Sequence, residues 1–391
     1  MKRQALNQSK YYVTRAASAL VTVVFCATSL FLFSGCEEEE VAAAGAAPKY
    51  LYISSGACYS GNGVTAFTNA TSSNLVYRLN LTTGAKERTI ADYFASPANP
   101  GDSPVAVVSE NSSSLLVLIE NTTTVGLRRI ERVSKTGATS RTTYSGNITA
   151  LSAQARAMTL LPDGYLLVSK STAIEKMKDG SNRLLKGANP WVSLSTPASS
   201  CTTSATLLSS VVRLNNGGIV FSHAATGAAR IGVVDPLGYA IAGDCKSAQA
   251  SPNAASFPTA MAYDGTNRKL IVAYAGSTTA ADINTIYSYD VDETTSVLSN
   301  PQELYDSSLF GSTYNYLLFG VSAITLDTTN GYLYVATAVS TATTVANYKI
   351  EKLKYAPANI GSNNPAVLSW EKTFYDFGGD TKCISSMAIA D

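Results

Sequence analysis

Few residues of this chain could carry acid–base, nucleophilic or metal chemistry. The 391 residues include six Cys and a single His, His223. The sequence has no CxxC pair and no Cys/His cluster with the spacing of a metal site, so we expect neither zinc nor another cofactor. A lone His more often packs or forms a hydrogen bond than catalyses, and His223 is retained only as a candidate binding residue. These residues favour a protein that is not an enzyme.

The net charge and the charged fraction of the chain exclude some classes of function. The formal net charge is +1, from 29 Lys and Arg against 28 Asp and Glu. This balance creates no long-range field that would attract phosphate backbones, so no nucleic-acid partner is expected. Only 15% of the residues are charged, below the roughly 25% that is usual in soluble proteins. Ser, Thr, Ala, Asn and Gly fill the intervals between apolar runs, which is typical of an all-β protein with many turns.

Residues 1–35 have the layout of a secretory signal peptide. The basic start "MKRQALNQSKYYVTR" is followed by an apolar stretch from Ala16 to Phe33 that is expected to be helical. It ends in "LFLFSGC", which resembles the signal of bacterial lipoproteins, although Phe33 departs from the usual Leu or small aliphatic residue. The resemblance implies that Cys36 becomes the acylated first residue of the mature protein. A transmembrane anchor is the alternative, because about 18 apolar residues lie at the short edge of spanning length.

Residues 36–48 are expected to form a flexible tether. The segment "EEEEVAAAGAAP" offers little apolar surface to bury. Acyl chains on Cys36 would hold the protein on a membrane, which indicates the bacterial cell envelope and, within it, the outer membrane. The acidic run also resembles surface-export signals of some bacterial lipoproteins, so a periplasmic and a surface-facing location both stay open.

Five segments of the expected mature chain share one order of predicted elements: a short apolar strand, a tight turn and a second apolar strand. They read "SPVAVVSENSSSLLVLIE", "ARAMTLLPDGYLLVSK", "SSVVRLNNGGIVFSH", "PTAMAYDGTNRKLIVAY" and "VSAITLDTTNGYLYVAT". A third strand follows each, and a weaker fourth strand comes after most of them. Short strands separated by Gly, Asn and Asp turns predict antiparallel meanders. The spacing of roughly 50 to 60 residues lies in the range of β-propeller blades.

The two ends of the mature domain, residues 49–391, complete the repeat. The start "KYLYISSG" matches a second strand, and "NLVYRLNLTTG" matches a third strand with its turn. The end "CISSMAIAD" matches a first strand and is followed by nothing. One blade is therefore expected to combine both termini, which closes the ring and leaves no long sheet edge exposed. The sequence predicts six blades of four antiparallel strands, with seven blades as the alternative.

The stretch "AITLDTTNGYLYVAT" resembles the repeats of NHL and TolB-like six-bladed propellers. The other segments are degenerate copies. The resemblance implies the propeller fold. Similar propellers include metal-dependent lactonases, which place acidic and Asn ligands around a central ion. Here the first strands read mostly as apolar or small residues, so a calcium cage is not expected.

Four cysteines remain in the exported domain, and an even number there favours disulfides. Three connectivities are possible, and the propeller arrangement selects among them. Cys58 follows the second strand of the composite blade and Cys383 precedes its first strand, so the two are expected to meet. Cys201 and Cys245 are expected on loops before and after the fourth unit, on one face of the ring, where they could also pair.

Long connections are expected to gather on one face of the ring, because most of the turns on the other face are tight. Insertions confined to one face usually mark a binding face. We name as candidate contact residues the long-loop aromatics, the His on the same side and two Arg of the first strands: Tyr59, Trp191, Tyr314, Tyr316, His223, Arg156 and Arg213. Asp163, Asp264, Asp327 and Asp391 are expected to shape turns.

These features favour a membrane-tethered binding or scaffold module with a monomeric body. Its long-loop face would bind an envelope protein, a peptide or a glycan. A propeller hydrolase or lactonase is one alternative. A surface adhesin is another, because the loops are rich in Ser, Thr, Asn and Ala.

Overall fold

The computed structural model of the chain describes most of the residues from Tyr50 to Ala390. The described residues are 50–56, 58–60, 65–68, 74–93, 101–121, 128–137, 141–145, 155–170, 173–178, 182–184, 192–193, 208–223, 230–234, 245–250, 256–275, 284–309, 311–313, 315–341, 344–357, 367–378 and 383–390. The predicted signal peptide, Cys36 and the tether lie outside them. Among the described residues, no helix has both the length and the apolar character needed to cross a membrane.

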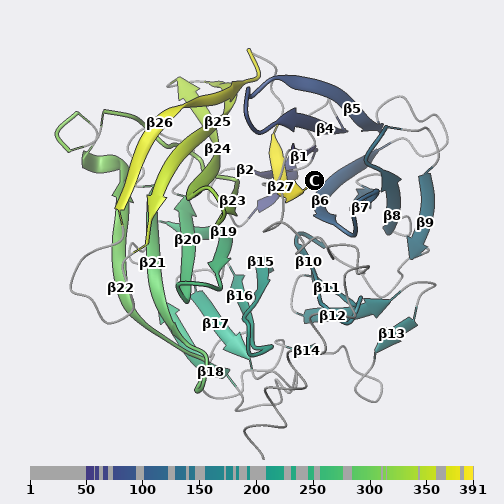
Figure 1. Cartoon of the computed structure of the whole chain (residues 1–391), viewed down its shortest axis with the longest axis horizontal. Coiled ribbons are helices and arrows are strands. Elements are labelled where there is room, and N and C mark those ends of the chain that lie inside the picture. The colour runs from purple at the N-terminus through teal and green to yellow at the C-terminus, as the bar shows by residue number, and fades with distance from the viewer. Residues whose placement is uncertain are drawn as a thin grey trace, which may run out of the picture. The chain divides into compact units, whose positions relative to one another are not determined.

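Six antiparallel sheets form the blades of a propeller, as predicted (Figure 1). We number the blades from the one that contains both termini, and give the strands of each from the innermost outward. Blade 1 contains β27 (Ile384–Ala390), β1 (Tyr50–Ser55), β4 (Leu75–Asn80) and β5 (Lys86–Asp92). Blade 2 contains β6 (Asp102–Ser109), β7 (Ser114–Asn121), β8 (Arg129–Ser134) and β9 (Arg141–Ser145). Blade 3 contains β10 (Met158–Leu160), β11 (Leu166–Lys170), β12 (Ala173–Lys178) and β13 (Asn182–Leu184), and β14 (Val192–Ser193) also pairs with β12.

The remaining three blades follow without interruption. Blade 4 contains β15 (Leu208–Arg213), β16 (Ile219–His223), β17 (Arg230–Val234) and β18 (Cys245–Ala250). Blade 5 contains β19 (Phe257–Asp264), β20 (Lys269–Ala275), β21 (Thr285–Asp292) and β22 (Val297–Asp306). Blade 6 contains β23 (Ala323–Asp327), β24 (Tyr332–Thr341), β25 (Thr344–Ala356) and β26 (Val367–Asp376). A separate hairpin, β2 (Cys58–Ser60) and β3 (Thr65–Thr68), lies between β1 and β4 in the sequence.

Blade 1 closes the ring in the predicted way. The C-terminal strand β27 is its innermost strand, and it pairs with β1 from Tyr50 opposite Ala390 to Ser54 opposite Ser386. Each inner strand also contacts the inner strands of both neighbouring blades. The six-blade prediction is therefore confirmed.

Burial along each strand reflects its position in the blade. Every residue of β7 and β20 is buried, because both faces of a second strand pack against neighbouring blades. An outer strand such as β22 exposes most of one face. Continuous apolar runs therefore mark strands that are covered on both faces, and alternation marks strands with one face in water.

The apolar core is divided among six clusters, one at each junction between blades. The cluster between blades 1 and 2 joins Tyr52 and Val76 to Val107 and Leu115. The other five clusters likewise combine residues of consecutive blades. Stability is therefore distributed around the ring, and every blade depends on both of its neighbours.

Buried tyrosines make the fold sensitive to alkaline pH. Tyr274 is fully buried, its hydroxyl lies 2.7 Å from that of Tyr289, and burial raises the pKa of both phenols above 10.0. Burial also raises the pKa of Tyr93.

We expect the free energy of unfolding to fall as the pH rises above 10.0, where phenols ionise in the unfolded chain but not in the folded one. The slope is about 1.4 kcal/mol per pH unit for each such tyrosine. Urea unfolding at neutral pH and at about one pH unit above 10 measures this loss. The double variant Tyr274→Phe, Tyr289→Phe should show a smaller loss, and an identical loss would contradict the assignment.

Candidate functional site

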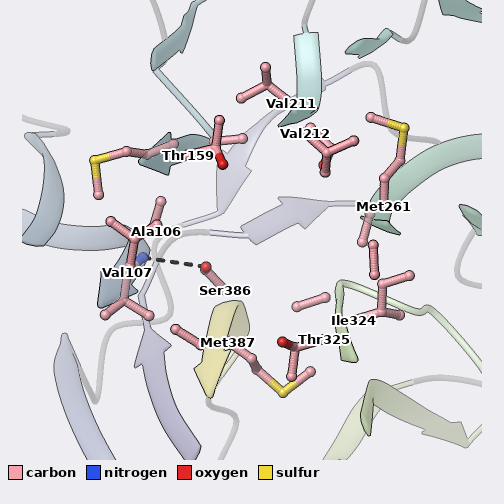
Figure 2. Close-up of a pocket in the computed structure, with 18 of the residues that line it drawn as sticks. Ala106, Val107, Thr159, Val211, Val212, Met261, Ile324, Thr325, Ser386 and Met387 are labelled. Atoms are coloured by element: carbon pink, nitrogen blue, oxygen red, sulfur yellow. Dashed lines mark hydrogen bonds between the residues drawn. The ribbon is translucent and has the colours of Figure 1, made fainter. Parts of the chain in front are cut away.

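The six inner strands surround a cavity of about 320 Å³ (Figure 2). Its lining residues come from β27, β6, β10, β15, β19 and β23, or from the residues directly before these strands. Most of them are Ala, Ser, Thr, Val or Met. The wall therefore consists mainly of methyl and hydroxyl groups, together with strand backbone.

Equivalent positions of the inner strands form a ring at one mouth of this cavity. The residues are Arg156, Ser209, Thr259, Ser322 and Ser385, which line the cavity, and Val105, which packs in the core between blades 2 and 3. Irregularities in strand pairing occur at four of these positions, in β6, β15, β19 and β27. Such bulges redirect a side chain relative to its neighbours in the strand.

Hydroxyl groups of this ring connect one blade to the next. Ser209 Oγ donates to the carbonyl of Pro258 at 2.7 Å, and Thr259 Oγ1 donates to that of Val321 at 2.7 Å. Ser385 Oγ lies 3.0 Å from the Pro104 carbonyl, across the junction of blades 1 and 2. These bonds hold neighbouring inner strands together and define the width of the mouth.

A metal-dependent lactonase would need carboxylate or amide ligands at the inward ends of these strands. The mouth ring instead carries hydroxyl groups, one Val and one Arg. Among the described residues, no group of three or more His, Cys, Asp or Glu side chains could hold a metal ion. The hydroxyl groups and the guanidinium at the mouth ring suit hydrogen bonding better than Ca²⁺ coordination, which favours carboxylate and carbonyl oxygens.

Among the described residues that line the cavity, Arg156 is the single charged one. Its side chain is buried, with 4% exposed. Burial raises the pKa of the buried Glu120, and the positive charges of Arg128 and Arg156 oppose that rise. Glu120 Oε1 also accepts a hydrogen bond from Arg128 Nε at 2.5 Å. Arg156 therefore belongs to a buried charge cluster between blades 2 and 3.

A second buried network lies in blade 2. Arg129 contacts Asp102 at 2.6 Å through Nη2 and Glu131 at 2.7 Å through Nε. Asn121 donates to the other oxygen of Asp102 at 2.8 Å. Sequence reasoning missed this network, although the charges of "RRIER" at alternate positions of one strand were a usable signal, since such residues share a face.

Two predicted contact residues are buried against the blades. His223 ends β16 with 1% exposed, and its ring stacks on Phe221 with centroids 6.1 Å apart. Tyr316, with 9% exposed, stacks on Tyr305 at 5.2 Å and on Trp370 at 6.4 Å. In this structure both rings have packing roles, and the structure does not bring them to the cavity.

The other predicted contact residues are scattered. Arg213 ends β15 at the far end of the strand from Ser209, and the lining contributed by β15 ends at Val212. The backbone of Tyr59 lies in the hairpin strand β2. Trp191 and Tyr314 lie outside the described residues, so their binding roles stay predictions.

The structure describes only part of each predicted cysteine pair. Cys383 is buried, and its carbonyl accepts a hydrogen bond from the Gly56 N–H at 3.2 Å, two residues before Cys58. The Cys58 side chain is outside the described ones, so this pairing stays a prediction. The expected position of Cys245 is wrong: it begins β18 opposite Val234 instead of lying on a loop after blade 4. Strand β18 begins on the side of the ring where β15 ends, so Cys245 lies on that side. Cys201 lies outside the described residues, and its pairing with Cys245 stays a prediction.

Comparison with known proteins adds little beyond the fold. No family model and no curated protein matches the sequence. Among solved structures, a protein from Lactobacillus plantarum is similar at 10% identity and a TM-score of 0.46, covering 87% of this chain and 98% of that one. A gluconolactonase from Xanthomonas campestris is similar at 11% identity and a TM-score of 0.41, covering 78% of this chain and 85% of that one. A GH74 enzyme from Niastella koreensis has 15% identity and a TM-score of 0.46, covering 81% of this chain and 47% of that one. At these values the likeness carries no argument about activity.

Proposed function

We propose that this chain is a lipid-anchored protein of a bacterial envelope whose propeller binds a partner through one face. We call the side where the inner strands end the turn face, and the side where they begin the long-connection face. The difference between these two faces is the observation that carries the proposal.

Most connections of the turn face are tight turns closed by backbone hydrogen bonds, and the longer ones join β17 to β18 and β25 to β26. The N–H groups of Gly84, Gly164, Gly217 and Gly331 donate to carbonyls three or four residues earlier, at 2.8 to 3.0 Å. All four glycines have positive φ, between 70° and 89°, which suits residues without a Cβ. These turns leave little chain for recognition.

The long-connection face carries more chain. The hairpin β2–β3 lies within the connection from β1 to β4, and the 3-10 helix η2 (Ser307–Leu309) lies within that from β22 to β23. Connections on a rigid scaffold can vary without disturbing the core, and binding sites commonly form there. The partner we propose is an envelope protein, peptide or glycan.

Shortening connections on the long-connection face should remove the partner. The test variant replaces residues 94–100 and 276–283 by short Gly-Ser linkers. The matched control shortens 358–365, on the turn face between β25 and β26. Each full-length protein is cross-linked in its native envelope, and the captured species are identified by mass spectrometry.

The partner should be absent from the test variant and retained by the control, while circular dichroism shows both variants folded. Retention by both variants would reject connections 94–100 and 276–283 as the binding surface, and loss from both would show that binding does not depend on this face alone.

Replacing Cys36 by Ala should abolish acylation, because the thiol is the proposed acylation site. In that variant, the apolar stretch from Ala16 to Phe33 would be the remaining membrane-binding feature, without lipid. Mass spectrometry of the intact protein measures the acyl mass, and fractionation measures membrane retention. The presence of an acyl mass on the unsubstituted protein distinguishes the alternative, since a transmembrane anchor needs no lipid. Protease treatment of intact cells then separates a surface location from a periplasmic one.

A further inference from the structure

The central cavity has the features of a small-ligand site that is separate from the long-connection face. Its volume of about 320 Å³ lies at the lower end of the range of roughly 300–1,000 Å³ typical of ligand pockets. Strands from all six blades form the wall, so the site is as rigid as the fold itself.

Some hydroxyl groups of this wall have no hydrogen-bond partner among the described residues. The hydroxyls of Ser209, Thr259 and Ser385 bond across the blade junctions. In contrast, the side-chain hydroxyls of Thr159, Ser210 and Thr325 form no hydrogen bond with another described residue, although all three line the cavity. A hydroxyl can both donate and accept, so each offers two kinds of hydrogen bond to a ligand.

Thr159 and Thr325 occupy equivalent positions, three residues after the mouth-ring residues Arg156 and Ser322. They belong to blades 3 and 6, which face one another in a ring of six blades. Figure 2 shows the two hydroxyl oxygens directed into the cavity from different sides. The same position carries an apolar side chain in the other four blades: Val108, Val212, Ala262 and Ala388. Two opposed polar groups are thus separated by methyl groups.

The larger apolar side chains leave the cavity open. Met261 belongs to the cluster between blades 4 and 5, and Met387 belongs to that between blades 6 and 1. Figure 2 shows both side chains directed away from the middle of the cavity. Ala and Ser therefore set its width, at positions such as Ala260 and Ser386.

The electrostatics disfavour a charged ligand. Arg156 is 4% exposed at the mouth and interacts with the buried Glu120. The layer of Thr159 and Thr325 contains no charged side chain. A carboxylate or ammonium group that entered this layer would lose its hydration without gaining an opposite charge.

We propose that the cavity binds a small uncharged molecule with several hydroxyl groups on a compact hydrocarbon ring, of the size of a neutral monosaccharide or cyclitol, held between Thr159 and Thr325. The ligand's hydroxyls would pair with the threonine hydroxyls, and its C–H groups would contact Val108, Val212 and Ala262. This inference does not depend on the proposed partner, because the inner strands alone form the site.

Calorimetric titration of the full-length protein tests the proposal. The probes are D-glucose, D-galactose, D-xylose and myo-inositol, with D-gluconate and D-glucosamine as charged counterparts. The double variant Thr159→Val, Thr325→Val removes both hydroxyls at nearly constant volume. Thr89→Val, on the exposed face of β5, is the matched control. Ala262→Leu tests occupancy by filling space in the cavity.

At least one neutral probe should bind, and its affinity should fall about tenfold in the double threonine variant through loss of two hydrogen bonds. Thr89→Val should leave the affinity unchanged, and Ala262→Leu should abolish binding. The variant with shortened 94–100 and 276–283 connections should bind the sugar normally, even if it loses its partner. Absence of binding by all four neutral probes would overturn the proposal, as would equal binding of the charged counterparts or unchanged affinity in the double variant.

Discussion

Replacing Asp102 by Ala is expected to lower the free energy of unfolding by about 3–5 kcal/mol, because it removes one partner of a buried ion pair. Asp102 is fully buried, and its two carboxylate oxygens bond to Arg129 at 2.6 Å and to Asn121 at 2.8 Å. Without the carboxylate, the guanidinium of Arg129 keeps only Glu131 as an acidic partner in this network. Urea unfolding followed by circular dichroism measures the loss.

The control for this prediction is an ion pair at the surface. Glu371 contacts Lys352 at 2.9 Å, and 36% of the glutamate side chain is exposed. Glu371→Ala should cost less than about 1 kcal/mol, since solvent screens such pairs. If Asp102→Ala and Glu371→Ala cost the same, the buried network of blade 2 does not contribute as described.

Deleting residues 384–391 is expected to abolish the cooperative native state. The deletion removes β27, which pairs with β1 and contributes Ile384 and Met387 to the core between blades 6 and 1. Loss of each such side chain costs about 2–5 kcal/mol, against a total stability of about 5–15 kcal/mol for a typical domain. Size-exclusion chromatography should show an expanded chain, and the urea transition should lose its cooperativity.

Adding the missing strand in trans provides the control. A peptide of residues 383–391 should restore a cooperative transition at high concentration. The same peptide with Ile384 and Met387 replaced by Asp should not. A truncated protein that folds without any peptide would show that β27 is dispensable for closing the ring.

Much of the fold could be predicted because its signals are local. In "DTTNGYLYVAT", Asp327 Oδ1 accepts the Asn330 N–H at 3.0 Å, and Gly331 has a φ of 70°, as a tight turn between two strands requires. The composite blade followed from incomplete repeats at the two ends of the chain. The turn roles of Asp163 and Asp264 were also predictable, since each caps N–H groups two or three residues later.

The chemistry of the cavity could not be predicted to the same degree. Bulges at Ser209, Thr259 and Ser385 shift the alternation of the inner strands by one residue, and nothing in the sequence marks them. A shift of one residue exchanges the two faces of a strand. The sequence therefore could not show which inner-strand residues face the cavity and which face the junction with the neighbouring blade. The burial of Asp102 likewise depends on neighbouring strands that are distant in the sequence. Cys245 was misplaced because the start of an outer strand has a weak apolar pattern.

The pairing of Tyr50 with Ala390 also determines when folding can finish. During synthesis, β1, β4 and β5 emerge first, and their sheet is complete only when the last residues of the chain have followed. Contacts between such distant residues form slowly because a very long loop must close. Until β27 is present, blade 1 lacks its innermost strand and the core between blades 6 and 1 lacks Ile384 and Met387. The native ring is therefore complete only after the C-terminal strand β27 has been made.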